Sequence, residues 1–359
     1  MTILDRFALR APIIQAPMAG VSTPGMAAAV SNAGAIGSVA IGALGAAAAR
    51  SVMTEVRALT DRAFNVNVFA HQPPRRDAVL EKAWLNAMWP LFEQFGAEPP
   101  DQLKTLYPSF NEDDALLAAL VEAAPPVVSF HFGLPTPERT SALKAVGCLL
   151  IATATSLEEA LDARMAGMDA VVAQGYEAGG HRGMFDPDAA DAQLGTMALT
   201  RVLVMRGGLP VIAAGGIMDG AGVSAALELG AVAAQLGTAF IRCPESAADD
   251  HYRALLETCG GTPTQMTRVI SGRPGRCLQN KFTAWEGPDP SAVPDYPVGY
   301  DAGKALIAVA RAADDYGFGS YWAGEGAPLS RALPAAQLID ALINEMNDSG
   351  EPWPAVRVN

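Results

Sequence analysis

Basic residues are scarce in this sequence. Its 25 lysines and arginines stand against 38 acidic residues, which gives a formal net charge of −13 over 359 residues. Nucleic acids and anionic membrane surfaces attract proteins through a basic footprint, so this balance argues against both as partners. A small anionic ligand stays compatible, because a local site can be positive on an acidic protein.

Cysteines are few and scattered. Cys148, Cys243, Cys259 and Cys277 form no C-x-x-C pair and match no zinc-module spacing. The sequence also lacks an H-E-x-x-H motif and any other cluster with ligand spacing, so we predict no metal site. Free thiols without a disulfide framework favour a reducing, cytoplasmic setting.

Targeting and nucleotide-binding signals are missing too. No basic segment followed by an apolar core opens the chain, so no secretory signal is predicted. The alanine-rich stretch 26–49 is interrupted by Ser31-Asn32 and by glycines, which indicates a helix, a strand and a helix rather than a membrane span. No G-x-G-x-x-G follows the first strand, which argues against a separate NAD-binding Rossmann domain.

What the chain does have is a large apolar fraction, 50%, and a repeated alternation of short apolar runs with helical patterns. This alternation predicts an α/β fold, a (β/α)8 TIM barrel with right-handed crossovers. We expect the barrel over residues 1–241, with a helical excursion at about 73–124 after the third strand. The eight predicted strands fall within 13–20, 35–40, 64–69, 127–133, 149–155, 170–174, 209–217 and 231–240.

The last two predicted strands each end in a glycine motif. Gly215-Gly216 follows the seventh strand and Gly237-Thr238 follows the eighth. Loops at these places in barrels often hold a phosphate on backbone N–H groups, and glycine lets the phosphate approach the backbone. Glycines needed only for helix–strand packing are the alternative.

Polar side chains stand at the upper ends of five predicted strands. For any one of them, a hydrogen-bonded buried polar residue is the simpler interpretation. As a set they would suit a phosphorylated planar ligand such as FMN, which needs donors and acceptors around its rings. The set comprises Gln15, Asn67, His131, Thr153, Gln174 and His181.

His181 follows a glycine-rich turn at the end of the sixth strand, where barrels place their chemistry. We predict that it is a general base with a pKa near neutrality; a histidine that only caps the turn is the alternative. His131 ranks second as a catalytic residue and His71 third. Arg182 could meet a substrate carboxylate, although a solvent-exposed arginine is the simpler interpretation.

These motifs together resemble the nitronate monooxygenase family, formerly called 2-nitropropane dioxygenases. The resemblance covers about residues 10–285, and Tyr321 to Gly324 is also similar. The motifs that carry it are Q-A-P-M at 15–18, Asn67, A-G-G-H-R-G at 178–183, A-A-G-G-I at 213–217 and Q-L-G-T at 235–238.

The resemblance implies an FMN-dependent barrel that oxidises alkyl nitronates with O₂ to a carbonyl compound and nitrite. It also implies a smaller substrate or lid domain, placed at 242–320, before a C-terminal segment, 321–359, whose helix packs back on the barrel. His181 matches the family's base. With the strand-end residues above, the expected cofactor-binding set is Ala16, Pro17, Met18, Asn67, Thr153, Gln174, Gly179, Gly180, Gly215, Gly216, Gln235, Leu236, Gly237 and Thr238.

The mechanistic hypothesis is proton removal by His181, one-electron transfer to FMN to give a semiquinone, and trapping of the radical by O₂. An FMN-dependent NAD(P)H:quinone or enoyl-thioester reductase is the alternative. A flavin-free isomerase or aldolase would need a Schiff-base lysine or paired carboxylates, which we do not find, and a non-catalytic flavin carrier would not need His181. The substrate, with propionate 3-nitronate as one option, and the oligomeric state, with a homodimer as one option, stay open.

Overall fold

The computed structural model describes residues 4–258, 263–285, 287, 289 and 292–348. Eight parallel strands form its centre in the order β1-β9-β8-β6-β5-β4-β3-β2, and a parallel bridge from Ile14 to Ile36 brings β1 beside β2. The predicted TIM barrel is confirmed. Its strands are β1 (Ile13–Gln15), β2 (Gly37–Ala40), β3 (Phe64–Phe69), β4 (Val127–His131), β5 (Leu149–Ala154), β6 (Ala170–Gln174), β8 (Val211–Ala214) and β9 (Ala233–Leu236).

Strand β3 shows why these segments form a barrel wall. Side chains alternate across a strand, so Phe64, Val66 and Val68 face the surrounding helices in one apolar cluster. Asn65 and Asn67 take the opposite face, and their amides donate to groups of β2 and β4. The strand therefore gives the core its apolar face and the barrel interior its polar face.

The barrel interior is apolar at its lower end. Ile14, Ile36, Val172 and Ile212 pack there in one cluster, which Leu4 of the N-terminal segment joins. This packing fills the lower barrel with side chains, as is usual for the fold. Space for a ligand is therefore left at the other end, where the strands terminate.

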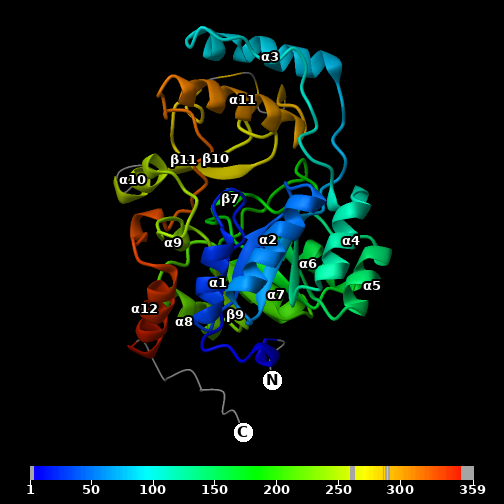
Figure 1. Cartoon of the computed structure of the whole chain (residues 1–359), viewed down its shortest axis with the longest axis vertical. Coiled ribbons are helices and arrows are strands. Elements are labelled where there is room, and N and C mark those ends of the chain that lie inside the picture. The colour runs from blue at the N-terminus through cyan, green and yellow to red at the C-terminus, as the bar shows by residue number, and fades with distance from the viewer. Residues whose placement is uncertain (1–3, 259–262, 286, 288, 290–291, 349–359) are drawn as a thin grey trace.

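Helices surround the strands (Figure 1). Helix α1 has a capped start: Thr23 accepts from the N–H of Met26, and Pro24 is the first helical residue. The last helix, α12, packs against α8 and α1 and so occupies the position that follows β9 around the barrel. These helices are α1 (Pro24–Asn32), α2 (Ala46–Leu59), α4 (Asp114–Ala123), α5 (Pro137–Ala145), α6 (Leu157–Met165), α7 (Thr196–Arg206), α8 (Gly220–Glu228), α9 (Thr238–Ile241) and α12 (Ala335–Asp348).

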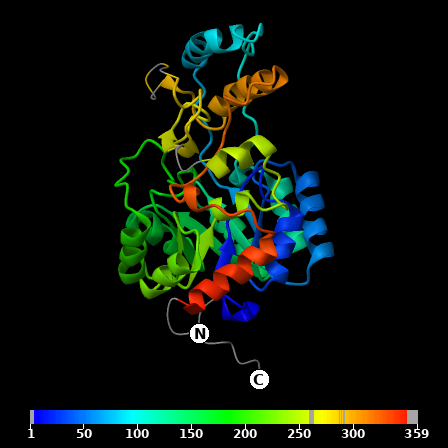
Figure 2. The ribbon, with the colours of Figure 1, turned by 90° about the vertical axis from the view of Figure 1, so that its left-hand side faces the viewer.

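The excursion after β3 divides into two parts. Helix α3 (Ala78–Glu93) packs against α11 (Val298–Ala312), whereas α4 packs against α2 on the barrel. Figures 1 and 2 both show α3 and α11 stacked at the end of the molecule farthest from the two termini. The excursion therefore reaches across to a segment more than 200 residues later in the sequence.

A small antiparallel sheet lies between the barrel and α11 (Figure 1). It has the order β10-β11-β7, with β10 (Thr264–Thr267), β11 (Gly275–Leu278) and β7 (Gly180–His181), and α10 (Asp250–Thr258) precedes it. His181 follows a turn, as predicted, but the turn is shorter than expected, because Gly180 and His181 already pair with β11. In the described part of the chain, no helix is long and apolar enough to cross a membrane.

Candidate active site

A cavity of about 590 Å³ opens at the carboxyl ends of the barrel strands, under the small sheet and α11. The predicted catalytic and cofactor-binding residues line it, apart from Leu236 and, in the strand-end set, Gln15. They are Ala16, Pro17, Met18, Asn67, His131, Thr153, Gln174, Gly179, Gly180, His181, Gly215, Gly216, Gln235, Gly237 and Thr238.

Leu236 faces away from the cavity. Its side chain is 1% exposed and packs in the apolar cluster between β9 and the neighbouring helices. Strand alternation explains this, because Gln235 and Gly237 on either side face the cavity. Gln15 does not line the cavity either; its amide accepts from the N–H of Ser38 and donates to Ser22, which holds the loop after β1.

The glycines at one end of the cavity have conformational and packing reasons to be glycine. Gly215 and Gly216 have φ values of +124° and +69°, where a side chain would strain the backbone. A Cβ on Gly215 would also lie 2.6 Å from the hydroxyl of Thr196. The packing interpretation therefore applies to this loop, and the approach of a ligand to its backbone stays a prediction.

His181 is held from two sides. Its Nε2 lies 2.8 Å from the hydroxyl of Ser271, which is fully buried. Its carbonyl oxygen accepts from Nε2 of Gln174 and faces Nε2 of His131 at 3.2 Å. The backbone and the ring are thus both fixed, and Nδ1 is the ring nitrogen left for a ligand.

His131 is tied to the same network. Its Nδ1 lies 3.0 Å from the hydroxyl of Thr153, so both ring nitrogens have a partner. A ring with both nitrogens engaged positions its neighbours better than it transfers protons. His181 therefore keeps one free ring nitrogen and His131 keeps none, while their predicted catalytic roles stay predictions.

The electrostatics of the cavity keep both histidines neutral. Burial lowers the pKa of His181 to about 3, and the positive charges of Arg273 and Lys304 act in the same direction. Burial also lowers the pKa of His131 to about 4. The pKa of His181 therefore lies below the predicted neutral range, first because the ring is buried and second because positive charges lie near it.

The sequence of this chain matches a known protein family. The family model described as nitronate monooxygenase matches residues 2–345. The chain belongs to the nitronate monooxygenase family.

Individual relatives agree with this membership. The chain is 54% identical over 353 residues to a nitronate monooxygenase of Paraburkholderia phytofirmans, which covers 97% of this chain and 96% of the relative. It is similar to the solved structure of nitroalkane oxidase from Streptomyces ansochromogenes, with a TM-score of 0.86, 36% identity and 97% and 98% coverage of the two chains. Its likeness to FabK from Thermotoga maritima is lower, with a TM-score of 0.72, 29% identity and 97% and 96% coverage.

The structure adds cavity residues that sequence reasoning missed. Tyr107, Tyr296, Tyr300, Lys304 and Trp322 all line the cavity. Three of the rings surround His181, with centroids at 4.6 Å for Trp322, 5.3 Å for Tyr296 and 5.9 Å for Tyr300. Apolar spacing in 298–310 could have revealed α11, and with it Tyr300 and Lys304, but nothing local connects these residues to a site 120 positions earlier.

Arg182 and His71 are both buried away from the cavity. Arg182 is 2% exposed and forms an ion pair with Asp191 at 2.8 Å, so neither a substrate carboxylate nor solvent is its partner. His71 is 2% exposed, and its ring nitrogens have no hydrogen-bond partner. It packs edge-on against Tyr296 instead.

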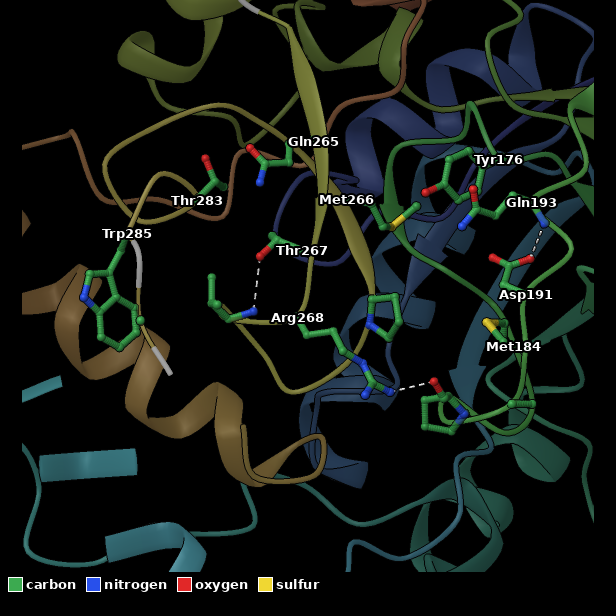
Figure 3. Close-up of a pocket in the computed structure, with 15 residues that line it drawn as sticks. Tyr176, Met184, Asp191, Gln193, Gln265, Met266, Thr267, Arg268, Thr283 and Trp285 are labelled. Carbon is green, nitrogen blue, oxygen red and sulfur yellow. Dashed lines mark hydrogen bonds between the residues drawn. The ribbon is translucent and has the colours of Figure 1, made fainter. Parts of the chain in front are cut away.

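A second cavity, of about 410 Å³, lies between β10 and the loop after β7 (Figure 3). Tyr176, Met184, Met266 and Trp285 contribute to its lining, together with Arg268, whose guanidinium donates to the carbonyl of Pro187. None of the predicted site residues lines it. The first cavity is therefore the candidate active site.

Metal and thiol chemistry find no support in the part of the chain that the structure describes. No group of three or more histidine, cysteine or acidic side chains is arranged to hold a metal ion there. Cys148, Cys243 and Cys277 are buried free thiols, and Cys259 lies outside the described residues. The cytoplasmic setting stays a prediction.

Proposed function

We propose that the protein oxidises alkyl nitronates, and nitroalkanes after deprotonation, with O₂ to a carbonyl compound and nitrite, using FMN. The observation that carries this proposal is His181: a neutral imidazole, fixed through Ser271, facing a cavity that also has a glycine-lined end. Membership of the nitronate monooxygenase family supports the same reaction.

The residues present suit FMN. The cavity has a size typical of cofactor sites. Gly216 and the turn from Gly237 into helix α9 would offer backbone N–H groups to a phosphate, and Asn67 and Gln174, which line the same cavity, would help to hold the flavin ring system. Bound FMN would supply the electron acceptor and the reaction with O₂.

His181 suits the removal of a proton from carbon. It is unprotonated throughout the physiological pH range, since its pKa is lowered to about 3. Proton transfer creates a nitronate anion next to the new imidazolium, and this opposite charge raises the proton affinity of His181 when it is needed. Pre-formed nitronates do not require this step.

The cations and hydroxyls of the outer cavity suit an anionic substrate. Lys304 lines the cavity and lies 4.8 Å from the ring of Tyr300, while its side chain stays exposed to solvent, and partial burial lowers its pKa. Tyr107 and Tyr296 share a hydrogen bond between their hydroxyls. A nitronate or its carboxylate substituent would find donors here.

Ser271 should matter through the orientation of His181. Its hydroxyl lies 3.2 Å from the carbonyl of Arg273, and donation to that carbonyl leaves Nε2–H of His181 to donate to the serine. Nδ1 then carries the lone pair. We expect Ser271→Ala to lower kcat/KM for nitroethane by about 10- to 100-fold, because an unanchored ring loses its alignment. Steady-state assays with nitroethane and ethyl nitronate test this.

The control for Ser271 is another buried serine. Ser31 is 1% exposed and donates to the carbonyl of Ala63 on the far side of the barrel wall. Ser31→Ala should leave the ratio of the two substrates unchanged. A Ser271→Ala enzyme that loses both activities equally would show that the serine acts on folding or FMN binding instead.

The alternative, an FMN-dependent reductase, would use the same barrel and the same cofactor cavity, and it has a direct test. We expect the purified protein to be yellow, and under anaerobic conditions ethyl nitronate should change its flavin absorbance within seconds while NADH does not. Stopped-flow spectroscopy measures both. Rapid bleaching by NADH would favour the reductase, and a colourless protein that takes up no FMN would refute the flavin assignment.

A further inference from the structure

Arg273 is a buried cation without a carboxylate partner in the described chain. It lies in the turn between β10 and β11 and is 3% exposed. Its Nη2 donates to the carbonyl oxygen of Met184, and its Nε has no hydrogen-bond partner. Two carboxylates act on it from a distance, Glu159 and Asp186. Glu159 is already saturated by N–H and hydroxyl donors of Thr155 and by the N–H of Phe185.

Burial of a charge without an oppositely charged partner lowers the stability of the folded protein, so we expect the position of Arg273 to serve a function. The guanidinium carbon of Arg273 lies 4.3 Å from the centre of the Phe132 ring, and that ring lines the active-site cavity. Phe132 in turn contacts the rings of His181 and Tyr296, at 5.7 Å and 5.2 Å. Only a low-dielectric aromatic layer therefore lies between this charge and the cavity, and such a layer screens a charge weakly.

The other charges around His181 do not cancel it. Lys304 faces the ring from α11, and His131 faces it from β4 as a neutral imidazole. Tyr296 and Tyr300 are neutral, because burial raises their phenol pKa values. At the outer cavity Asp249 is paired with Arg311 at 2.7 Å. The groups nearest the histidine therefore sum to a positive field.

We propose that Arg273 is a positioning residue whose uncompensated charge, acting through Phe132, makes the cavity select anions over neutral molecules of the same shape. The anion is the nitronate group or another planar oxyanion, so the proposal rests on the proposed function for its biological meaning. The same field opposes protonation of His181, His131 and His71, all of which Arg273 influences. One side chain would thus add to the effect of burial, which keeps the base neutral, and would also favour the deprotonated substrate.

The test compares acetate with acetamide, two planar probes of nearly equal size that differ in charge. Each is titrated into the FMN-loaded protein, and its Kd is read from the flavin absorbance. A unit charge roughly 10 Å away in a medium of effective dielectric constant about 20 changes binding of an anion by about tenfold. We expect Arg273→Met to raise the Kd of acetate about tenfold and to change that of acetamide less than about twofold. Arg273→Lys should retain the preference.

Two further variants separate charge from structure. Arg273→Gln is neutral but can still donate to the Met184 carbonyl, so it should behave like Arg273→Met even if the methionine variant folds poorly. Arg268→Met removes an arginine of the same segment whose charge is paired with Asp188 at 2.8 Å, and it should keep the wild-type preference. Equal weakening of both probes by Arg273→Gln, or the same anion loss in Arg268→Met, would overturn the proposal.

The pH dependence of kcat/KM gives a second measurement, which would not change if Arg273 had only a structural role. In Arg273→Gln the acid limb of kcat/KM for nitroethane should shift upward by about one pH unit, because His181 then protonates more easily. An unchanged limb would contradict the proposal. If the wild-type protein failed to oxidise nitronates, the proposed function would fall, while the acetate and acetamide titration would still decide the role of Arg273.

Discussion

Replacing His181 with asparagine should reduce turnover of neutral nitroethane by about 10²- to 10⁴-fold and largely spare ethyl nitronate. General base catalysis contributes a factor of this size, and only the neutral substrate needs it. Asparagine can still reach toward the Ser271 hydroxyl, which lies 2.8 Å from the histidine Nε2, so the pocket should keep its shape. Parallel measurements of kcat/KM with both substrates test the prediction.

The design includes its own controls. His251→Asn changes a histidine that stacks on Tyr316, away from His181, and should leave both activities intact. FMN content and melting temperature should be measured for each variant. If His181→Asn lost both substrates equally while it retained FMN, His181 would be a binding residue and proton removal would have to be assigned elsewhere.

The barrel could be predicted because its signals are local. Each strand is a short apolar run, and the helix starts have caps such as Thr23 and Pro24. The glycine motifs could be placed in one cavity for the same reason, since the carboxyl ends of barrel strands always meet. Leu236 shows the limit of a motif, because the motif does not say which of its residues point inward.

The cover of the cavity could not be predicted, because it is built from distant pairings. Strand β7 exists only because Gly180 and His181 meet Arg276 and Gly275. Helix α3 is an amphipathic helix that packs against α11, and neither helix's sequence indicates that the other is its partner. The lowered pKa of His181 is a consequence of these pairings. The sequence shows only a histidine beside glycines, whereas the fold buries the ring and brings Lys304 and Arg273 near it.

Mild acid should destabilise the protein well above the pH at which carboxylates titrate. Burial lowers the pKa values of His71 and His131 to about 4 and that of His181 to about 3, from an ordinary value of 6.5. Below pH 6.5 the unfolded chain therefore binds protons that the folded chain does not, so the free energy of unfolding falls as pH falls. Each histidine contributes up to about 1.4 kcal/mol per pH unit until its folded pKa is reached. Together the three should remove about 5 kcal/mol between pH 7 and pH 5, a large share of a typical stability.

Urea unfolding of the FMN-loaded protein at pH 7, 6 and 5 measures how the free energy of unfolding changes with pH. His71→Phe isolates the contribution of one histidine to this pH dependence. His71 makes no hydrogen bond and packs edge-on against Tyr107 and Tyr296, so phenylalanine can occupy its place. The variant should match the wild type near pH 7, be more stable at pH 5, and lose about a third of the slope, since it removes one of three equivalent proton sites. A wild-type stability that stays flat from pH 6.5 to 5 would show that these rings are protonated in the folded state, and the neutral His181 on which the proposed base chemistry depends would then be untenable.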